Sequence, residues 1–167
     1  MKNIVLIGLM GSGKTMVSKE LATRSGYARF STDELIEEQE GKSVKEIVAQ
    51  HGWEYFRALE KDIVSQLSAK QGIIIDCGGG VVLDPENFTL LKKHGIIFYL
   101  DASPQVLFER IGSDPNRPLV NVPDPLARIT QLHAERLPLY AQADCTIDAN
   151  DPSLEGPVVR ILQRMKL

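Results

Sequence analysis

The residues with the most specific chemistry lie near the N-terminus, where the chain reads Gly-Leu-Met-Gly-Ser-Gly-Lys-Thr. This run fits the phosphate-binding pattern G-x-x-x-x-G-K-S/T. Glycines let the backbone turn so that its N–H groups approach phosphate oxygens, the lysine reaches the β- and γ-phosphates, and the threonine hydroxyl can ligate Mg²⁺. The motif predicts a site for ATP and Mg²⁺ made by Gly8, Gly11, Ser12, Gly13, Lys14 and Thr15.

The motif needs a strand before it and a helix after it. Asn3–Ile7 is a short apolar run, and Lys14–Ser25 has helical spacing that Gly26 ends. The N-terminus of that helix would add partial positive charge beside the phosphates. The flanking elements therefore support a true phosphate-binding loop (P-loop) rather than a chance match.

Strand and helix signals then alternate along the chain. We expect further strands at Tyr27–Phe30, Ile73–Ile75, Ile96–Leu100 and Cys145–Ile147. We expect further helices at Asp33–Glu40, from a capping box at Ser43, at Trp53–Ala69, from Asp84 to Gly95, from Ser103, at Leu126–Tyr140 and at Leu154–Met165. The alternation predicts a three-layer α/β P-loop fold with a central parallel sheet of about five strands flanked by helices. We expect residues 1–167 to form a single domain.

One segment lacks any periodicity. Gly112–Pro125 contains four prolines among turn-forming residues. We interpret residues 112–125 as a mobile loop.

Composition narrows the class of protein. The net charge of −3 over 167 residues argues against nucleic-acid binding, which needs a basic face. No apolar run approaches the roughly 20 residues of a membrane span. The two cysteines form no disulfide or zinc pattern. We expect a cytoplasmic protein with small-molecule partners, no nucleic acid and no membrane.

Other P-loop classes fit less well. A GTPase would carry the guanine-reading sequence N-K-x-D, which is absent, although Asp76-Cys77-Gly78-Gly79 matches the loose D-x-x-G pattern. A motor or large ATPase would need a longer chain. A compact small-molecule kinase remains. Residues 1–167 would be its single kinase domain, and residues 112–125 would be a lid that closes over the acceptor and excludes water.

Six segments in order and in register resemble the shikimate kinases. They are Asp33-Glu34-Leu35-Ile36-Glu37, Phe56-Arg57 with Glu60, Gly78-Gly79-Gly80, Tyr99-Leu100-Asp101-Ala102-Ser103-Pro104, Arg117-Pro118-Leu119, and Arg136-Leu137-Pro138-Leu139-Tyr140 followed by Ala143-Asp144. The resemblance covers the chain from end to end. It implies ATP-dependent phosphorylation of shikimate to shikimate 3-phosphate, in aromatic amino-acid biosynthesis, by a monomeric enzyme.

The resemblance also implies that residues 33–61 form the main acceptor-binding segment, with further contacts from the three glycines and from α-helical residues nearer the C-terminus. Arg57 and Arg136 would hold the shikimate carboxylate, which a guanidinium matches with two hydrogen bonds. Asp33 would orient the attacking hydroxyl, and the backbone N–H groups of Gly79 and Gly80 would donate to the acceptor. Gly78, Gly79 and Gly80 would also let the ring lie against the backbone. From the residues alone, Arg57 could instead pair with Glu60 or Glu54 on a solvated helix face, and Asp33 could be an ordinary charge at a helix N-terminus.

The nucleotide end completes the expected site. Arg117, in the expected lid, would contact the transferring phosphate, as an arginine finger does. Arg110 matches a position that stacks on adenine in the resembling family, although it could simply be a surface charge at a helix C-terminus. Pro152, in the segment after the last strand, would form the other wall of the adenine pocket.

The chain departs from the family at the expected metal site. The family carries two aspartates separated by one residue, whereas this chain reads Ser31-Thr32-Asp33. We expect Asp76, with Thr15, to supply the Mg²⁺-side carboxylate that Ser31 lacks; the alternative is that Asp76 only hydrogen-bonds the P-loop backbone. The departure leaves open a non-catalytic nucleotide-binding regulator. A second alternative is a related kinase for another small acid such as gluconate, which should not need both Arg57 and Arg136 together with the three glycines.

Overall fold

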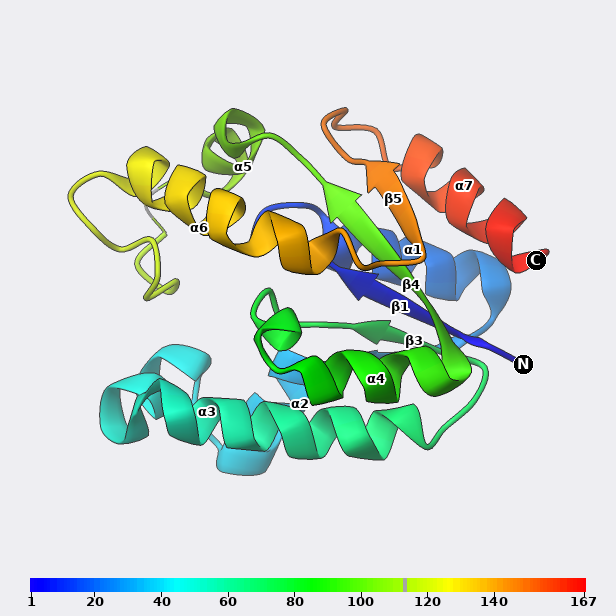
Figure 1. The fold of residues 1–167 in the computed structure, drawn as a ribbon, viewed down its shortest axis with the longest axis horizontal. Coiled ribbons are helices and arrows are strands. Elements are labelled where there is room, and N and C mark those ends of the chain that lie inside the picture. Colours follow the sequence, from blue (N-terminus) through cyan, green and yellow to red (C-terminus); the bar gives the residue numbers. More distant parts are fainter. Residues whose placement is uncertain (113) are drawn as a thin grey trace.

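A five-stranded parallel sheet forms the centre of the structure, a computed structural model that describes residues 1–112 and 114–167 (Figure 1). The strands lie in the order β2-β3-β1-β4-β5. Their bounds are Asn3–Ile7 for β1, Ala28–Ser31 for β2, Ile73–Asp76 for β3, Gly95–Asp101 for β4 and Cys145–Asp148 for β5. All five predicted strands are confirmed, each within one residue at either end.

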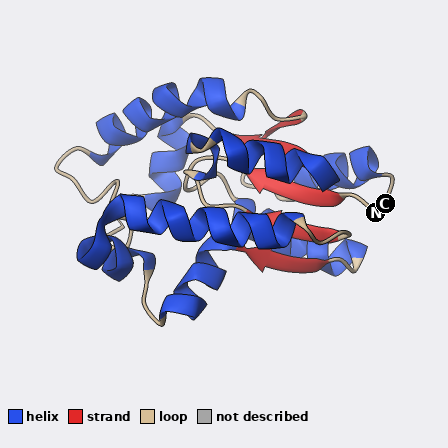
Figure 2. Cartoon of the chain, turned by 60° about the horizontal axis from the view of Figure 1, so that its bottom comes forward, coloured by secondary structure: helices blue, strands red, loops and turns tan. Residues whose placement is uncertain are grey.

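Helices cover both faces of this sheet (Figures 1 and 2). Side chains alternate along each strand. Ile4 and Leu6 of β1 therefore face α1 and α7, whereas Val5 and Ile7 face a larger core made with α2, α3, α4 and α6. The helices are α1 Lys14–Ser25, α2 Thr32–Glu40, α3 Val44–Ser68, α4 Pro85–His94, α5 Pro104–Ile111, α6 Pro125–Tyr140 and α7 Glu155–Met165, with a 3-10 helix, η1, at Val81–Leu83. The three-layer prediction is confirmed.

Local sequence explains where the helices begin. Ser43 accepts a hydrogen bond from the Glu46 backbone N–H while the Glu46 side chain accepts one from the Ser43 N–H, the reciprocal pair of a capping box. Asp84 and Ser103 each cap a helix whose first residue is proline. Gly52, with φ 83° and ψ 172°, separates the first part of α3 from Trp53 onward, as the two predicted helices require.

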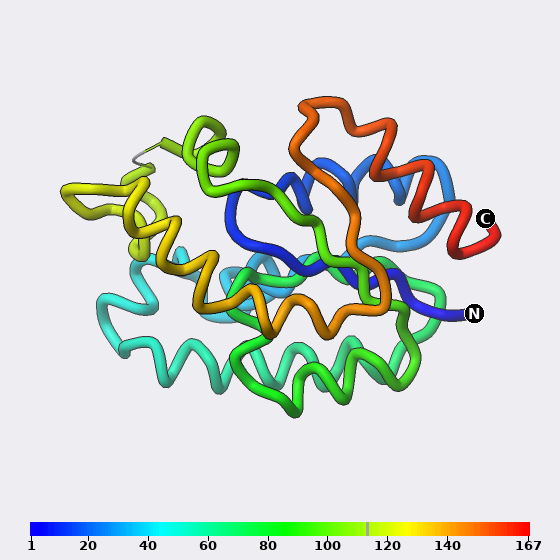
Figure 3. Tube along the Cα trace, turned by 45° about the horizontal axis from the view of Figure 1, so that its top comes forward, coloured from blue at the N-terminus to red at the C-terminus, as the bar shows by residue number. Residues whose placement is uncertain are grey.

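The segment expected to be a lid has no helix or strand from residue 114 to 124; residue 113 of that segment lies outside the described residues. Residues 114–124 lie at the end of the molecule opposite the two chain termini (Figure 3). Val120 is fully buried, so the segment packs against the body of the protein in this conformation.

Parallel pairing places the chemically active segments at one edge. The P-loop follows β1, α2 follows β2, and the three glycines follow β3, all at the carboxyl ends of neighbouring strands, where open α/β sheets bind ligands. Ser31 and Asp76 are register partners on β2 and β3, so the residue that departs from the family and the expected substitute lie side by side. None of the helices in the described part of the chain is long and apolar enough to cross a membrane.

Candidate active site

The P-loop has the geometry of a phosphate cradle. Gly8, Gly11 and Gly13 have φ of 150°, 81° and 91°, values that side-chain-bearing residues rarely adopt. A Cβ on Gly8 would also lie 2.7 Å from the Leu100 carbonyl oxygen. Helix α1 begins directly after Gly13, with no side-chain cap and no acidic residue in its first turn. Its first N–H groups and its partial positive charge are therefore available to an anion.

Lys14 is buried within this loop. Its Nζ donates to the carbonyl oxygens of Gly8, at 2.8 Å, and Leu9, at 3.2 Å. Burial lowers the pKa of Lys14, and the nearby carboxylates of Asp76 and Asp33 oppose that shift. The ammonium group is thus held in place beside the glycine turns, where the motif puts the β- and γ-phosphates.

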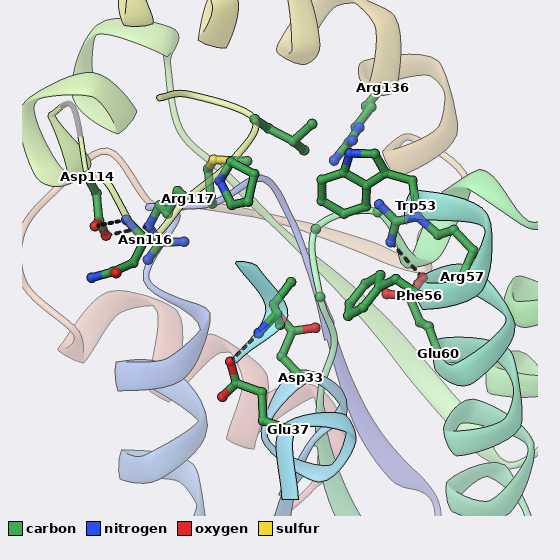
Figure 4. Close-up of a pocket in the computed structure, with 17 residues that line it drawn as sticks. Asp33, Glu37, Trp53, Phe56, Arg57, Glu60, Asp114, Asn116, Arg117 and Arg136 are labelled. Carbon is green, nitrogen blue, oxygen red and sulfur yellow. Dashed lines mark hydrogen bonds and ion pairs between the residues drawn. The ribbon is translucent and has the colours of Figure 1, made fainter. Parts of the chain in front are cut away.

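Two cavities adjoin at the carboxyl edge of the sheet. The smaller, of about 190 Å³, is lined by the P-loop with Thr15, Ser31 and Asp76. The larger, of about 330 Å³, is lined by α2, α3, the three glycines, Arg136 and residues 116–119 (Figure 4). Met10, Asp33, Gly78, Gly79 and Arg117 line both cavities. Two ligands could therefore meet at these shared residues.

Arg57 projects from α3 into the larger cavity (Figure 4). Its Nη1 lies 2.8 Å from Glu60 Oε1, and its guanidinium carbon lies 5.2 Å and 5.3 Å from the ring centroids of Trp53 and Phe56. The Glu60 side chain is only 1% exposed. The pairing with Glu60 that the sequence allowed is therefore present, but the pair lies in a cavity wall and not on a solvated helix face.

Two carboxyl groups in this wall have an oxygen without a partner. Asp33 Oδ1 and Glu60 Oε2 are buried and accept no hydrogen bond from the described residues. Burial raises the pKa of Asp33, opposed by Lys14, and raises the pKa of Glu60 to about 7 although Arg57 opposes it. An unpaired buried acceptor costs free energy, so both oxygens favour a ligand that brings hydroxyl donors.

The three glycines leave room for these side chains. A Cβ on Gly80 would lie 2.1 Å from Arg57 Nη2, and one on Gly78 would lie 2.6 Å from Asp33 Oδ1 and 3.1 Å from Glu60 Oε2. The Gly78 N–H donates to the Thr32 hydroxyl. The glycine turn therefore does more than connect β3 to η1. Any side chain at Gly80 or Gly78 would displace a charged group of the cavity.

Arg136 and Arg117 complete the set of expected cations. Arg136 on α6 is 5% exposed and lines the larger cavity close to Gly79. Arg117 lines both cavities, and its Nε lies 3.2 Å from Asp114 Oδ2. The structure brings Asp33, Arg57, Arg136, Arg117 and Lys14 to one connected space, as the sequence reasoning required.

Asp76 lies in the smaller cavity and is 4% exposed. Its Oδ2 accepts from Arg29 Nη2 at 2.8 Å and from the Ser18 hydroxyl at 3.2 Å. Among the described residues Oδ1 accepts no hydrogen bond, and Asp76 makes none to the P-loop backbone. The ion pair with Arg29, which also pairs with Glu34, was not expected from the sequence.

Arg110 links the P-loop to the segment that follows β5. Its guanidinium donates to the carbonyl oxygen of Gly11 in the P-loop and to those of Ala149, Asn150 and Asp151. The segment that contains Pro152 is therefore held beside the P-loop, which is where an adenine wall would have to be. These contacts occupy the edges of the guanidinium group.

Sequence reasoning did not select some residues that form the site. Trp53, Phe56 and Glu60 line the larger cavity but were not proposed as ligands. Their spacing could have indicated them, because with Arg57 they fall on one face of α3. The same spacing is typical of an ordinary buried helix face, so it does not identify a ligand site. The pairing of Arg29 with Asp76 had no local signal, because the two residues lie 47 positions apart.

Comparisons with known proteins agree on one family. The family model described as shikimate kinase matches residues 10–166. A shikimate kinase of Caldanaerobacter subterraneus is 48% identical over 98% of this chain and 95% of its own length. One of Thermodesulfovibrio yellowstonii is 43% identical over 98% of this chain and 94% of its own. The solved shikimate kinase from Acinetobacter baumannii in complex with shikimate has a TM-score of 0.95 and 32% identity, covering 99% of this chain and 93% of that one.

We expect Gly80→Ala to displace Arg57 from the cavity, because the new methyl group would overlap its guanidinium. Affinity for an anionic ligand of this cavity should fall by roughly tenfold or more, the effect of losing one charge-assisted hydrogen bond. ATP affinity should stay unchanged. Isothermal titration with each ligand measures both.

Gly156→Ala is the matched control, since a Cβ there meets nothing within 4 Å. Equal acceptor affinity in Gly80→Ala and in the unmodified chain would contradict the steric role of Gly80.

Proposed function

The chain belongs to the shikimate kinase family, and we propose that it transfers the γ-phosphoryl group of ATP to shikimate, giving shikimate 3-phosphate. The observation that carries the proposal is the convergence of two guanidinium groups and two unpaired carboxyl oxygens on a cavity that adjoins the P-loop. Shikimate offers the matching groups, one carboxylate and three hydroxyls.

The acceptor would bind in the larger cavity. Its carboxylate pairs with Arg57 and Arg136, because planar guanidinium groups match a carboxylate with two parallel hydrogen bonds. Its hydroxyls donate to Asp33 Oδ1 and Glu60 Oε2, which are buried and accept no hydrogen bond from the described residues. Gly78, Gly79 and Gly80 give the ring a surface free of side chains.

Transfer would take place where the cavities meet. Asp33 lines both cavities and orients the hydroxyl that attacks the γ-phosphorus in line; its raised pKa suits it to accept the departing proton. Lys14 and Arg117 stabilise charge on the transferring oxygens. Positioning and electrostatics account for most of the rate in phosphoryl transfer, so no strong base is needed.

The residues at the smaller cavity fit a hydrated Mg²⁺. Among the described residues no group of three or more acidic, histidine or cysteine side chains could hold a metal alone. Mg²⁺ bound with ATP keeps several waters and needs only one or two protein contacts. We propose that the Thr15 hydroxyl and Asp76, through its unpartnered Oδ1, hold the ion, which would neutralise charge on the β- and γ-phosphates.

We propose that the whole chain, residues 1–167, works as one kinase domain and as a cytoplasmic monomer. Residues 112–125 form its lid and residues 33–61 its main acceptor-binding segment. Arg117 on the lid lines both cavities, which supports a closing role. The free Cys77 and Cys145 agree with a reducing compartment. Arg110 and Pro152 are proposed as parts of the adenine pocket.

The activity itself is tested by following ADP release from ATP and Mg²⁺ in a coupled assay. We expect ADP with shikimate and none above background with gluconate or without an acceptor. Release with gluconate alone would identify a sugar-acid kinase instead. ATP binding with no transfer to either acceptor would identify a nucleotide-binding regulator.

The proposed metal role of Asp76 predicts that Asp76→Asn raises the Mg²⁺ concentration for half-maximal rate by roughly tenfold or more, the usual effect of losing a carboxylate near a metal. Asp62→Asn on the exposed side of α3 is the matched control. An unchanged Mg²⁺ requirement in Asp76→Asn would show that Asp76 only holds Arg29 and Ser18 in place.

A further inference from the structure

Tyr140, the last residue of α6, contacts the glycine turn from outside the acceptor cavity. Its hydroxyl donates to the Gly79 carbonyl oxygen at 2.5 Å, and the residue is completely buried. Among the described residues, Tyr140 is not one of those that line the cavity, whereas Gly79 and Gly80 are. The contact therefore acts on the turn and not directly on a ligand.

This hydrogen bond fixes the direction of a whole peptide group. The Gly79 carbonyl and the Gly80 N–H belong to one planar peptide, which is trans, so the two groups point in opposite directions. Tyr140 holds the carbonyl on its own side, and the N–H must point the other way. Neither the Gly79 nor the Gly80 N–H donates to any described residue of the protein.

Glycine alone would not hold this direction. A peptide between two glycines rotates more freely than any other, so its orientation has to come from contacts. The Gly78 N–H is held by Thr32, and the Gly78 carbonyl accepts from Val81. Tyr140 makes the corresponding contact for the next peptide along the turn.

The phenol is itself held firmly. The rings of Tyr140 and Tyr99 stack with centroids 4.9 Å apart and planes 13° apart, and the Tyr99 hydroxyl donates to Asp101 at 2.7 Å. Tyr140 also lies one helical turn after Arg136, whose side chain lines the cavity. The Arg136 guanidinium lies close enough to the phenol to oppose the rise that burial causes in the pKa of Tyr140. Helix α6 thus provides both Arg136, which lines the cavity, and Tyr140, which holds the Gly79 carbonyl oxygen.

We propose that Tyr140 is a positioning residue for acceptor binding: by holding the Gly79 carbonyl oxygen it sets the direction of the Gly80 N–H, the donor that the family resemblance already implies for the acceptor. The inference rests on the proposed function, which supplies the acceptor. Buried N–H groups are nearly always paired, and a hydroxyl or carboxylate oxygen of shikimate is the partner this one would take.

The test is Tyr140→Phe, which removes one oxygen and keeps the stacked ring. We expect the KM and the Kd for shikimate to rise roughly fivefold to tenfold, the effect of one hydrogen bond, while the KM for ATP stays unchanged. Fluorescence of Trp53, the only tryptophan, reports shikimate binding without turnover because it lines the cavity. Tyr99→Phe is the matched control: it also loses a buried hydroxyl in the same stack, and shikimate affinity should not change.

Three results would overturn the proposal. Shikimate affinity in Tyr140→Phe could equal that of the unmodified chain, or could fall equally in Tyr99→Phe, or ATP affinity could fall in parallel, which would indicate a packing role. Amide hydrogen exchange separates an effect on the turn from an effect on Arg136, which also lies beside the phenol. The Gly80 N–H should become protected from exchange when shikimate saturates the unmodified chain without ATP, and that protection should be weaker in shikimate-saturated Tyr140→Phe. Equal protection in the two proteins would overturn the proposal.

Failure of the proposed function would look different. The unmodified protein would then show no fluorescence change with shikimate and no ADP release, before any variant is compared. Binding of shikimate by the unmodified chain together with no effect of Tyr140→Phe would leave the proposed function standing and remove the positioning role alone.

Discussion

The absence of side chains after β3 is the constraint on which the acceptor site depends. Arg57, Asp33 and Glu60 come from two helices, yet their charged ends all lie within 3.1 Å of where a Cβ on Gly80 or Gly78 would be. Only glycine leaves that space open. The turn brings a backbone surface, rather than a fourth side chain, against the ligand, and the two helices can then approach it closely enough to place their charges together.

Because these charged groups are buried close together, each needs a partner of opposite charge or a hydrogen bond. A buried charge without a partner is costly. Glu60 pairs with Arg57, and Lys14 donates to P-loop carbonyl oxygens. Arg136, however, has no carboxylate partner among the described residues, so the cavity favours an anion. The pKa of Glu60, raised to about 7 by burial, has a further consequence. As the pH falls through that value Glu60 takes up a proton and no longer offsets Arg57, so the attraction of the cavity for a carboxylate grows.

Much of this architecture could be predicted from local sequence. The P-loop, the capping residues and the apolar strand runs each depend on neighbours within a few residues, and these elements lie where they were expected. The burial of the Arg57–Glu60 pair could not be read in the same way, because the sequence spacing is identical for an exposed and a buried pair. Arg29 with Asp76 and Tyr140 with Gly79 join residues 47 and 61 positions apart. Such contacts depend on how strands pair and helices pack, which no local pattern specifies.

The central claim is that two guanidinium groups select an anionic acceptor beside the P-loop. Shikimate titrations monitored by Trp53 fluorescence test it most directly in Arg57→Lys and Arg136→Lys, with Arg128→Lys as control, because Arg128 is a half-buried residue of α6 that does not line the cavity. Lysine keeps the charge but loses the paired donors. The account predicts that each cavity variant binds shikimate roughly tenfold to a hundredfold more weakly, with ATP binding and the control unchanged. Unchanged shikimate affinity in both cavity variants would contradict it.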